Sequence, residues 1–381
     1  MAPANPQERF HFLDALRGIA ALAIVILHNY QMLNAKTGFT YPDWLHKLIF
    51  SGHSGVTIFF IISGFVIAYS VRKSFISFHY CKLFFIKRSI RLDPPYWITL
   101  FVMISSSLLF AKLVAKQDES VFQNAEIISN IFYLQGFFDH SSINPVSWTL
   151  CMELQLYLFF VLMLATIFRI SLIASYQQQI QLIASRAFPL FFAFLLFLSL
   201  EQNLNLIFPS SAIYPYNPFA LHYWYLFFLG VATCWEKIGW IQRTWLYSYY
   251  AIVFVYILAS LQKEMAAGLS IAAMIHLLGR HDYLTTWRGH PVFQYLGKIS
   301  YSLYLIHWLA SSNFINFVSK RAGDIYPAKA TLILAGGILV AIGAAHVFYE
   351  WIEHPCLKWS QRLSIPQERL HQTAIQSRYA K

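Results

Sequence analysis

Residues 12–30 read FLDALRGIAALAIVILHNY, and this stretch decides the class of fold. A helix needs about 20 mostly apolar residues to cross the hydrocarbon core of a bilayer, and this run stays apolar to residue 33. It is longer than the apolar core of a signal peptide, and the preceding MAPANPQERF has no basic n-region. We therefore predict a retained membrane-spanning helix over residues 12–33.

The rest of the chain has the same apolar character. Hydrophobic residues make up 57% of the 381 residues and charged residues only 12%, against about 25% charged residues in an ordinary soluble domain. The mean hydropathy is +0.50. So little polar material cannot cover a soluble surface, whereas a bilayer accepts an apolar one. Composition therefore predicts a polytopic integral membrane protein.

The net charge of +11 does not indicate a nucleic-acid partner. Lys and Arg occur in short tracts between apolar runs, as topology signals do, and not as one basic patch on a soluble face. Cys81, Cys151, Cys234 and Cys356 form no CxxC pair and no metal-ligand spacing. We expect free thiols, no metal and no bound cofactor.

Apolar runs of sufficient length predict an all-α bundle of about ten transmembrane helices. We expect a membrane domain over residues 1–355, followed by a short polar cytoplasmic tail over residues 356–381. The predicted spans are residues 12–33, 55–71, 95–114, 147–168, 188–207, 218–235, 245–261, 265–279, 298–318 and 329–350.

The orientation follows from the distribution of Lys and Arg, which favour the cytoplasmic side. Ten spans with the N-terminus inside place 20 of the 28 Lys and Arg residues inside and 8 outside. A single missed span would swap the side of every later loop and weaken this bias. Both termini are therefore predicted to be cytoplasmic.

Three ionisable residues lie in the first predicted span, where each is costly and needs a reason. Asp14 and Arg17 are three positions apart and can pair on one helix face. Arg17 and His28 are eleven positions apart, which places them on the same face, about 16 Å apart along the axis. Arg17 would lie near the cytoplasm and His28 near the outer side. The structural alternative is a snorkelling Arg and a His bonded to a neighbouring helix.

Glu153 lies near the outward end of the fourth predicted span, at a depth similar to that of His28. A carboxylate beside an imidazole can orient it as a general base. This pattern predicts that His28 and Glu153 carry the chemistry. The alternative is that Glu153 pairs with His28 only to hold two helices together.

A basic tract, KRSIRLDPPYW, covers residues 87–97. Pro94 and Pro95 predict a helix start here, with the basic residues in the loop before it. As a first interpretation, the tract is a positive-inside anchor. As a second, Arg88 and Arg91 bind phosphate, because guanidinium groups match phosphate oxygens.

The ninth predicted span opens with GKISYSLYLIHW, residues 297–308, which is unusually polar. Hydroxyl groups of this kind bond across helices as packing contacts, and we expect that of Ser302 and Tyr304. His307 lies deeper and could line a cavity. The remaining histidines in or near spans are interpreted as structural, because nothing around them has metal-ligand spacing: His222, His276 and His346.

Six motifs in order resemble those of the membrane acyltransferase-3 family, whose members acylate sugars of lipopolysaccharide O-antigens, glucans and related glycans. Each motif alone is weak, but together they run from residue 12 to residue 355. Thr149 and Asp93 depart from the family pattern without removing a catalytic group. The motifs are LDALRG with its His28, FFIISGFVIAYS, KRSIRLDPPYW, SWTLCMELQLY, GKISYSLYLIHW and FYEWIEHP.

The resemblance implies an O-acyltransferase that transfers groups other than aminoacyl groups. Its co-substrate would be acyl-CoA, most commonly acetyl-CoA, and its acceptor a carbohydrate or glycolipid. His28 would be the catalytic base, with Glu153 beside it, and Arg17, Arg88 and Arg91 would bind the phosphates of the acyl donor. The residues expected to support the site are Asp14, Trp148, Tyr301 and His307.

The family also implies a place in the bacterial cytoplasmic (inner) membrane, surrounded by membrane lipid. Some relatives carry a C-terminal hydrolase-like domain, and this chain is expected to act without one. The alternative is a transporter or flippase for glycans or lipid-linked sugars, because polar groups at the midplane also fit that class. A glycan polymerase or ligase that uses lipid-linked sugars is a third interpretation.

Overall fold

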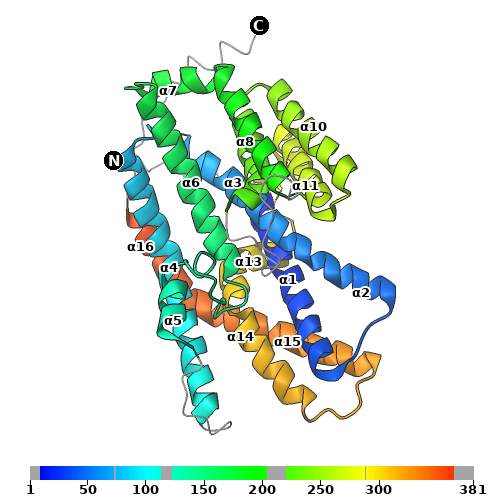
Figure 1. Ribbon diagram of the computed structural model, residues 1–381. Helices are drawn as coiled ribbons and strands as arrows, with labels where there is room; N and C mark the ends of the chain where they lie inside the picture. Colours follow the sequence, from blue (N-terminus) through cyan, green and yellow to red (C-terminus); the bar gives the residue numbers. More distant parts are fainter. Residues whose placement is uncertain (1–8, 73, 113–121, 204–219, 288, 364–381) are drawn as a thin grey trace. The chain divides into compact units, whose positions relative to one another are not determined.

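Within the described residues, every regular element is a helix and no strand is present (Figure 1). The predicted all-α class is therefore confirmed. All four cysteines are free and buried. The computed structural model describes residues 9–72, 74–112, 122–203, 220–287 and 289–363.

The chain divides into two compact units, and the first, residues 1–62 and 270–349, is built around α1 (His11–Thr37). α1 packs along α13 (Pro291–Lys298), α14 (Ser300–Ser319) and α15 (Pro327–Phe348), and small and branched side chains fill the contact. The remaining elements of this unit are α2 (Asp43–Phe50), η1 (Ser51–His53), the start of α3 (Ser54–Val71), the end of α11 (Lys263–Arg280) and α12 (Tyr283–Thr286).

Two glycines let α1 approach α13 closely. A Cβ atom on Gly18 would stand 2.5 Å from the backbone nitrogen of Gly297, and a Cβ atom on Gly297 would collide with the backbone oxygen of Asp14. Neither position accepts a larger side chain unless a helix moves. The glycines of the LDALRG and GKISYSLYLIHW motifs therefore bring these two distant segments together.

The second unit, residues 63–269 and 350–381, has an aromatic core. α9 (Trp224–Lys237) is buried along most of its length, and its rings pack against aromatic residues of α6 (Trp148–Ile170) and α8 (Ala187–Asn203). The remaining elements include the end of α3 and most of α11, together with α4 (Phe78–Phe110), α5 (Asn124–Ile131), α7 (Tyr176–Ile183), η3 (Ala220–Tyr223), α10 (Arg243–Ser260), a π-helical turn η4 (Tyr349–Glu353) and α16 (His354–Arg362).

Gly64 has the corresponding role in this unit. A Cβ atom on Gly64 would collide with the backbone oxygen of Phe227, so α3 lies directly against the backbone of α9. The glycine of the FFIISGFVIAYS motif is thus explained by a close helix contact, which a larger residue would force apart.

α4 differs from the prediction. Ser77 caps its start by accepting a hydrogen bond from a backbone N–H of the first turn at 3.2 Å. Pro94 and Pro95 therefore lie inside the helix, and the predicted helix start at these prolines is wrong. A proline removes one backbone hydrogen bond and disfavours a helix interior, but α4 packs against both α6 and α16. The basic tract consequently lies on a helix and not in a loop.

A helix lies at each of the ten ranges predicted to cross the membrane, but length and hydropathy support fewer spans. α9 has only 14 residues, and the Ser, Tyr and His residues of α14 lower its hydropathy.

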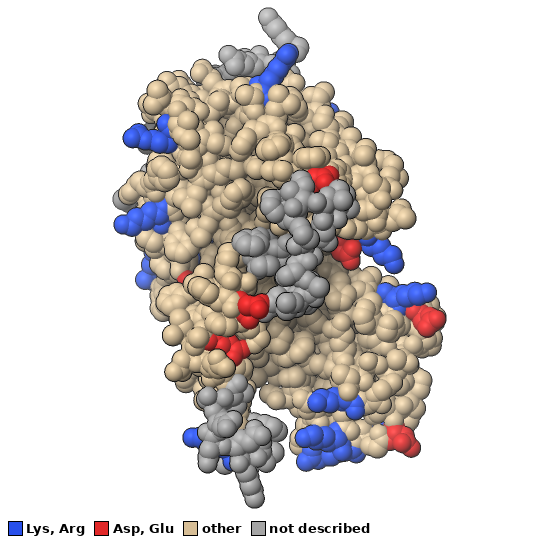
Figure 2. Space-filling view, in the orientation of Figure 1, with Lys and Arg blue, Asp and Glu red and all other residues tan. Residues whose placement is uncertain are grey.

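On the face shown in Figure 2, uncharged residues cover most of the surface, as expected beside lipid. Four described segments are long and apolar enough to cross a membrane, His11–Thr37, Asp43–Val71, Trp148–Ile170 and Pro327–Arg362, and up to five if the bent pair Tyr176–Ile183 and Ala187–Asn203 is one span.

The prediction of about ten spans is therefore not confirmed. The predicted polar tail is described only in part. Its first residues belong to α16, which ends at Arg362, and residues 364–381 lie outside the described ranges.

Candidate active site

Two histidines from distant parts of the sequence meet in the first unit. Nδ1 of His28, on α1, lies 2.9 Å from Nε2 of His307, on α14. The two imidazole rings are nearly parallel, with an interplanar angle of 9° and centroids 5.2 Å apart. Trp308 covers His28 edge-on at a centroid distance of 5.4 Å. These contacts hold the half-buried His28 ring in one orientation.

The hydrogen bonds of His307 assign the tautomers of both rings. Its Nδ1 atom lies 2.8 Å from the backbone oxygen of Tyr304 and 3.1 Å from that of Leu303. A carbonyl oxygen only accepts, so Nδ1 of His307 carries the proton and Nε2 is an acceptor in the neutral ring. His28 must then donate from Nδ1, which leaves Nε2 of His28 with a free lone pair. A neutral imidazole with a free Nε2 is able to accept a proton.

The residue predicted to orient the His28 ring was Glu153, and the partner that the structure describes at Nδ1 of His28 is His307. His307, fully buried on α14, was predicted only as a supporting residue. Tyr301, another predicted supporting residue, lies half-buried in the first turn of the same helix.

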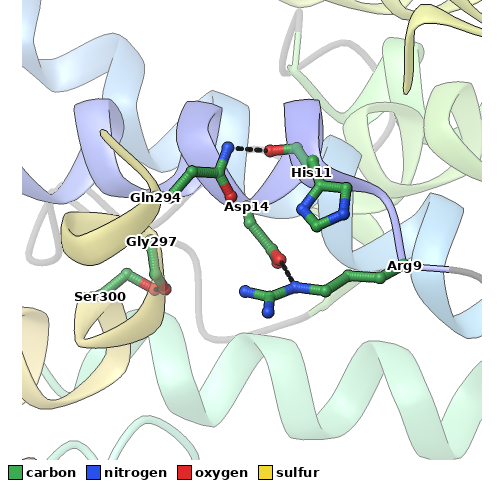
Figure 3. A network of polar contacts seen from close by, with 6 residues as sticks. All are labelled: Arg9, His11, Asp14, Gln294, Gly297 and Ser300. Carbon is green, nitrogen blue, oxygen red and sulfur yellow. Dashed lines mark hydrogen bonds and ion pairs between the residues drawn. The ribbon is translucent and has the colours of Figure 1, made fainter. Parts of the chain in front are cut away.

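The predicted pair of Asp14 with Arg17 is not formed. Asp14 instead accepts a hydrogen bond from Nε of Arg9 at 2.6 Å (Figure 3). Arg9 precedes α1, and its side chain extends to the Asp14 carboxylate. The spacing of three positions allows a pair of Asp14 with Arg17 but does not require it. In the same region the Gln294 amide donates to the backbone oxygen of His11 at 2.9 Å (Figure 3).

Arg17 is consequently left available. It is half-buried on α1 and makes no hydrogen bond or ion pair with any residue that the structure describes. A partly buried guanidinium without a partner is costly, since it gives up water contacts and gains no protein acceptor. A phosphate of a bound ligand would supply two acceptor oxygens in the geometry that Arg prefers.

In the second unit, Glu153 is held by two hydroxyl groups. Ser63, on α3, donates to Oε1 of Glu153 at 2.5 Å, and Tyr157 donates to the same oxygen from one turn further along α6. The hydroxyl oxygens of Tyr157 and Ser63 lie 3.1 Å apart and close the triangle. Hydrogen bonds to an ionised acceptor are stronger than neutral ones, so this carboxylate has a fixed position.

The basic tract contributes a second contact to this cluster. The Arg88 guanidinium carbon lies 5.2 Å from the ring centroid of Tyr157 and 5.7 Å from that of Phe84. Arg91 follows one turn later on α4 and is half-buried. Lys87 instead donates to the backbone oxygen of Leu363 at 3.0 Å, and burial, reinforced by the neighbouring Arg88, lowers the pKa of Lys87. The tract therefore divides into a Lys that anchors α16 and two Arg residues with other contacts.

Trp148 begins α6, and its ring centroid lies 5.8 Å from that of Tyr223.

The contact of Tyr157 with Glu153 was not predicted. A hydroxyl four residues after a membrane Glu lies on the same helix face, and this spacing could have indicated it. No role was predicted for Ser63, whose contact with Glu153 depends on packing between two helices.

The comparisons with known proteins identify the family of the chain. A family model described as an acyltransferase domain matches residues 10–349, nearly the whole chain. The chain belongs to the acyltransferase-3 family. The resemblance of the six motifs to this family is thereby confirmed.

Three relatives illustrate the membership. A Staphylococcus aureus (strain COL) protein, named as a candidate O-acetyltransferase, is 33% identical over 168 residues, which are 41% of this chain and 24% of that protein. Nodulation protein 10 of Rhizobium leguminosarum bv. viciae is 31% identical over 173 residues, 42% of this chain and 46% of the relative. The O-acetyltransferase OatA of S. aureus (strain NCTC 8325 / PS 47) is 29% identical over 160 residues, 40% of this chain and 24% of the relative.

The chain therefore spans about a quarter of the length of the staphylococcal relatives and about half that of the rhizobial one. No solved structure matches the chain.

Proposed function

We propose that this protein transfers an acyl group, in the first place acetyl, from acyl-CoA to a hydroxyl group of a carbohydrate or glycolipid. The observation that carries the proposal is the His28–His307 pair, which leaves Nε2 of His28 as a free, oriented base. The acyl group follows from the relatives named as O-acetyltransferases. The carbohydrate acceptor and the CoA donor follow from the family resemblance, with lipopolysaccharide O-antigen as one acceptor of the expected class.

His28 performs the proton transfer in this mechanism. Its Nε2 removes the proton of the acceptor hydroxyl while that oxygen attacks the thioester carbonyl. A carbon–oxygen bond forms, the carbonyl electrons return, and the carbon–sulfur bond breaks. The CoA thiolate leaves and takes the proton back from the His28 imidazolium, so the base is regenerated. The thioester is already activated, and no metal enters the mechanism.

His307 stabilises the charged intermediate state of its partner. When His28 is protonated, its Nδ1–H remains directed at Nε2 of His307 at the observed 2.9 Å. His307 itself stays in place because two backbone oxygens hold its Nδ1–H. His307 thus orients the His28 base and stabilises its protonated form, which is the role of a carboxylate in many hydrolases.

The basic residues would bind the donor. Arg17 has no protein acceptor among the described residues, so its guanidinium could bind a phosphate of the donor. Arg88 and Arg91 lie on α4, and each offers the same bidentate geometry. Glu153, fixed through Oε1, would accept a hydrogen bond from the acceptor sugar.

For the topology, we propose ten spans with both termini cytoplasmic, in the bacterial inner membrane. A helix lies at each of the ten ranges, and 20 of the 28 Lys and Arg residues then lie inside. Short helices such as α9 would cross beside others, with their polar residues facing the interior of the bundle.

The test is acyl transfer by the purified protein in lipid, with radiolabelled acetyl-CoA and with envelope vesicles from a strain that lacks this gene. Transfer of label into glycan, with one CoA thiol released for each acyl group, supports the proposal. A transporter, flippase, polymerase or ligase would release no CoA, so glycan movement or joining without thiol release would contradict it.

A further inference from the structure

The side chain of Tyr157 is buried on α6, and its hydroxyl group and its aromatic ring contact different residues. Its hydroxyl donates to Oε1 of Glu153, one helical turn before it. Its ring lies under the guanidinium of Arg88 at 5.2 Å and against the ring of Phe227 at 6.2 Å. One side chain therefore contacts a residue with a proposed role toward the acceptor and one with a proposed role toward the donor.

The hydroxyl contact determines which carboxylate oxygen is available. Ser63 and Tyr157 each have one hydroxyl proton, and both donate to Oε1 of Glu153. Oε2 of Glu153 accepts no hydrogen bond from a residue that the structure describes. The pair of donors thus holds one oxygen and presents the other to a ligand. Without the donors, the carboxylate could rotate about its last torsion angle, which is a soft one.

The ring contact works on a different residue. The guanidinium carbon of Arg88 lies over two rings, 5.2 Å from the centroid of Tyr157 and 5.7 Å from that of Phe84. Two aromatic faces restrict a guanidinium without using its N–H groups, because the attraction is to the face of the ring. These two ring contacts therefore limit where the Arg88 guanidinium can lie.

We propose that Tyr157 is a positioning residue for both substrates: its hydroxyl orients Glu153 toward the acceptor, and its ring orients Arg88 toward the phosphates of the acyl donor. This inference rests on the proposed acyl transfer. It makes the two roles separable, because Tyr157→Phe removes only the hydroxyl, whereas Tyr157→Leu removes the hydroxyl and the aromatic face.

A purely structural tyrosine predicts a different result. Tyr249 is a matched control, since it is fully buried in the same unit and donates to the backbone oxygen of Pro189 at 3.0 Å. Tyr249→Phe also loses one buried hydrogen bond, but that bond does not touch Glu153. Equal amounts of membrane-inserted protein, measured for every variant, separate folding from turnover.

The experiment measures kcat and the KM for acetyl-CoA, with radiolabelled acetyl-CoA and the envelope vesicles described above. Tyr157→Phe should lower kcat by about 10–100-fold with the KM for acetyl-CoA unchanged, which is the effect of one hydrogen bond to a charged group. Tyr157→Leu should lower kcat similarly and also raise the KM for acetyl-CoA by about 3–30-fold. Tyr249→Phe should match the wild type.

Ser63→Ala provides a second check, because it removes the other donor to Oε1. Its effect should also fall on kcat alone, and the Ser63→Ala/Tyr157→Phe double variant should depart from the product of the single effects, as expected for residues that act together. If Tyr157→Phe behaves like Tyr249→Phe while the wild type is active, the inference is overturned and the proposed function stands. If the wild type transfers no acyl group, the proposed function itself fails.

Discussion

Nδ1 of His28 and Nε2 of His307 lie 2.9 Å apart, on two helices separated by 279 positions in the sequence. The backbone oxygens of Tyr304 and Leu303 settle the direction of this hydrogen bond, since they require the proton of His307 on Nδ1. The free lone pair of His28 is therefore on Nε2. A catalytic base needs this combination of a fixed ring and an available nitrogen.

The role of His307 is tested by two substitutions with different chemistry. His307→Phe keeps the ring volume but removes the acceptor, so acyl transfer should fall by about 10²-fold or more. His307→Gln keeps an acceptor oxygen in reach and should retain more activity than His307→Phe. Turnover per inserted protein is the measurement.

His276→Phe is the control for these variants, because His276 is also a buried histidine of the first unit, on α11. If it lowers turnover as much as His307→Phe, the loss reflects packing and not the contact with His28. The double variant His28→Ala/His307→Phe should be scarcely slower than His28→Ala, since residues that act as a unit are non-additive.

Arg17 should contribute to binding of the donor. Arg17→Ala is expected to weaken acetyl-CoA binding by about tenfold or more, the effect of a hydrogen bond between charged groups. Arg17→Lys keeps the charge but loses the planar fork, and should remain impaired. Titration calorimetry of the protein in detergent measures the affinity. Arg243→Ala, at an exposed Arg already paired with Glu236, should leave the affinity unchanged, and an unchanged affinity in Arg17→Ala would rule the role out.

Gly297→Ala should destabilise the first unit. Its Cβ atom would collide with the backbone oxygen of Asp14, which cannot move without α1. Overpacking of this kind costs about 1–3 kcal/mol. Gly343→Ala, on α15 with nothing within 4 Å of the added Cβ, should be neutral or stabilising by up to about 1 kcal/mol. Thermal unfolding in detergent compares the two, and equal melting temperatures would contradict the close packing of α1 and α13.

The proposed topology predicts the side of the membrane at two positions. Reporter fusions after Lys116 and after Arg369, both outside the described residues, should report the outside and the cytoplasm respectively. The same side for both would exclude ten spans with cytoplasmic termini. Fusions are measured against matched expression levels, since poorly inserted protein gives no signal.

The apolar runs of the sequence predicted where the helices lie, but the predicted number of membrane spans is not confirmed. Apolar runs locate a helix such as α1 or α15, because burial of about 20 apolar residues determines it. α4 was predicted to begin at Pro94, but Ser77 caps it and packing against α16 carries it through the prolines. A local rule about proline cannot include that tertiary contact.

The candidate site was also predicted only in part from the sequence. His28 and Glu153 stand out as ionisable groups in apolar runs, and this signal is local. The partner of His28 is not local, because the contact with His307 depends on how α1 packs against α14. Asp14 pairs with Arg9 and not with Arg17, a choice that helix spacing alone leaves open.

The most direct test of the central claim is acyl transfer by the His28→Ala protein, purified in lipid, with the inserted protein quantified. If His28 is the base, turnover should fall by about 10²–10⁴-fold, the usual contribution of a general base, with acetyl-CoA binding close to that of the wild type. Near-normal turnover in His28→Ala would contradict the assignment of His28 as the base.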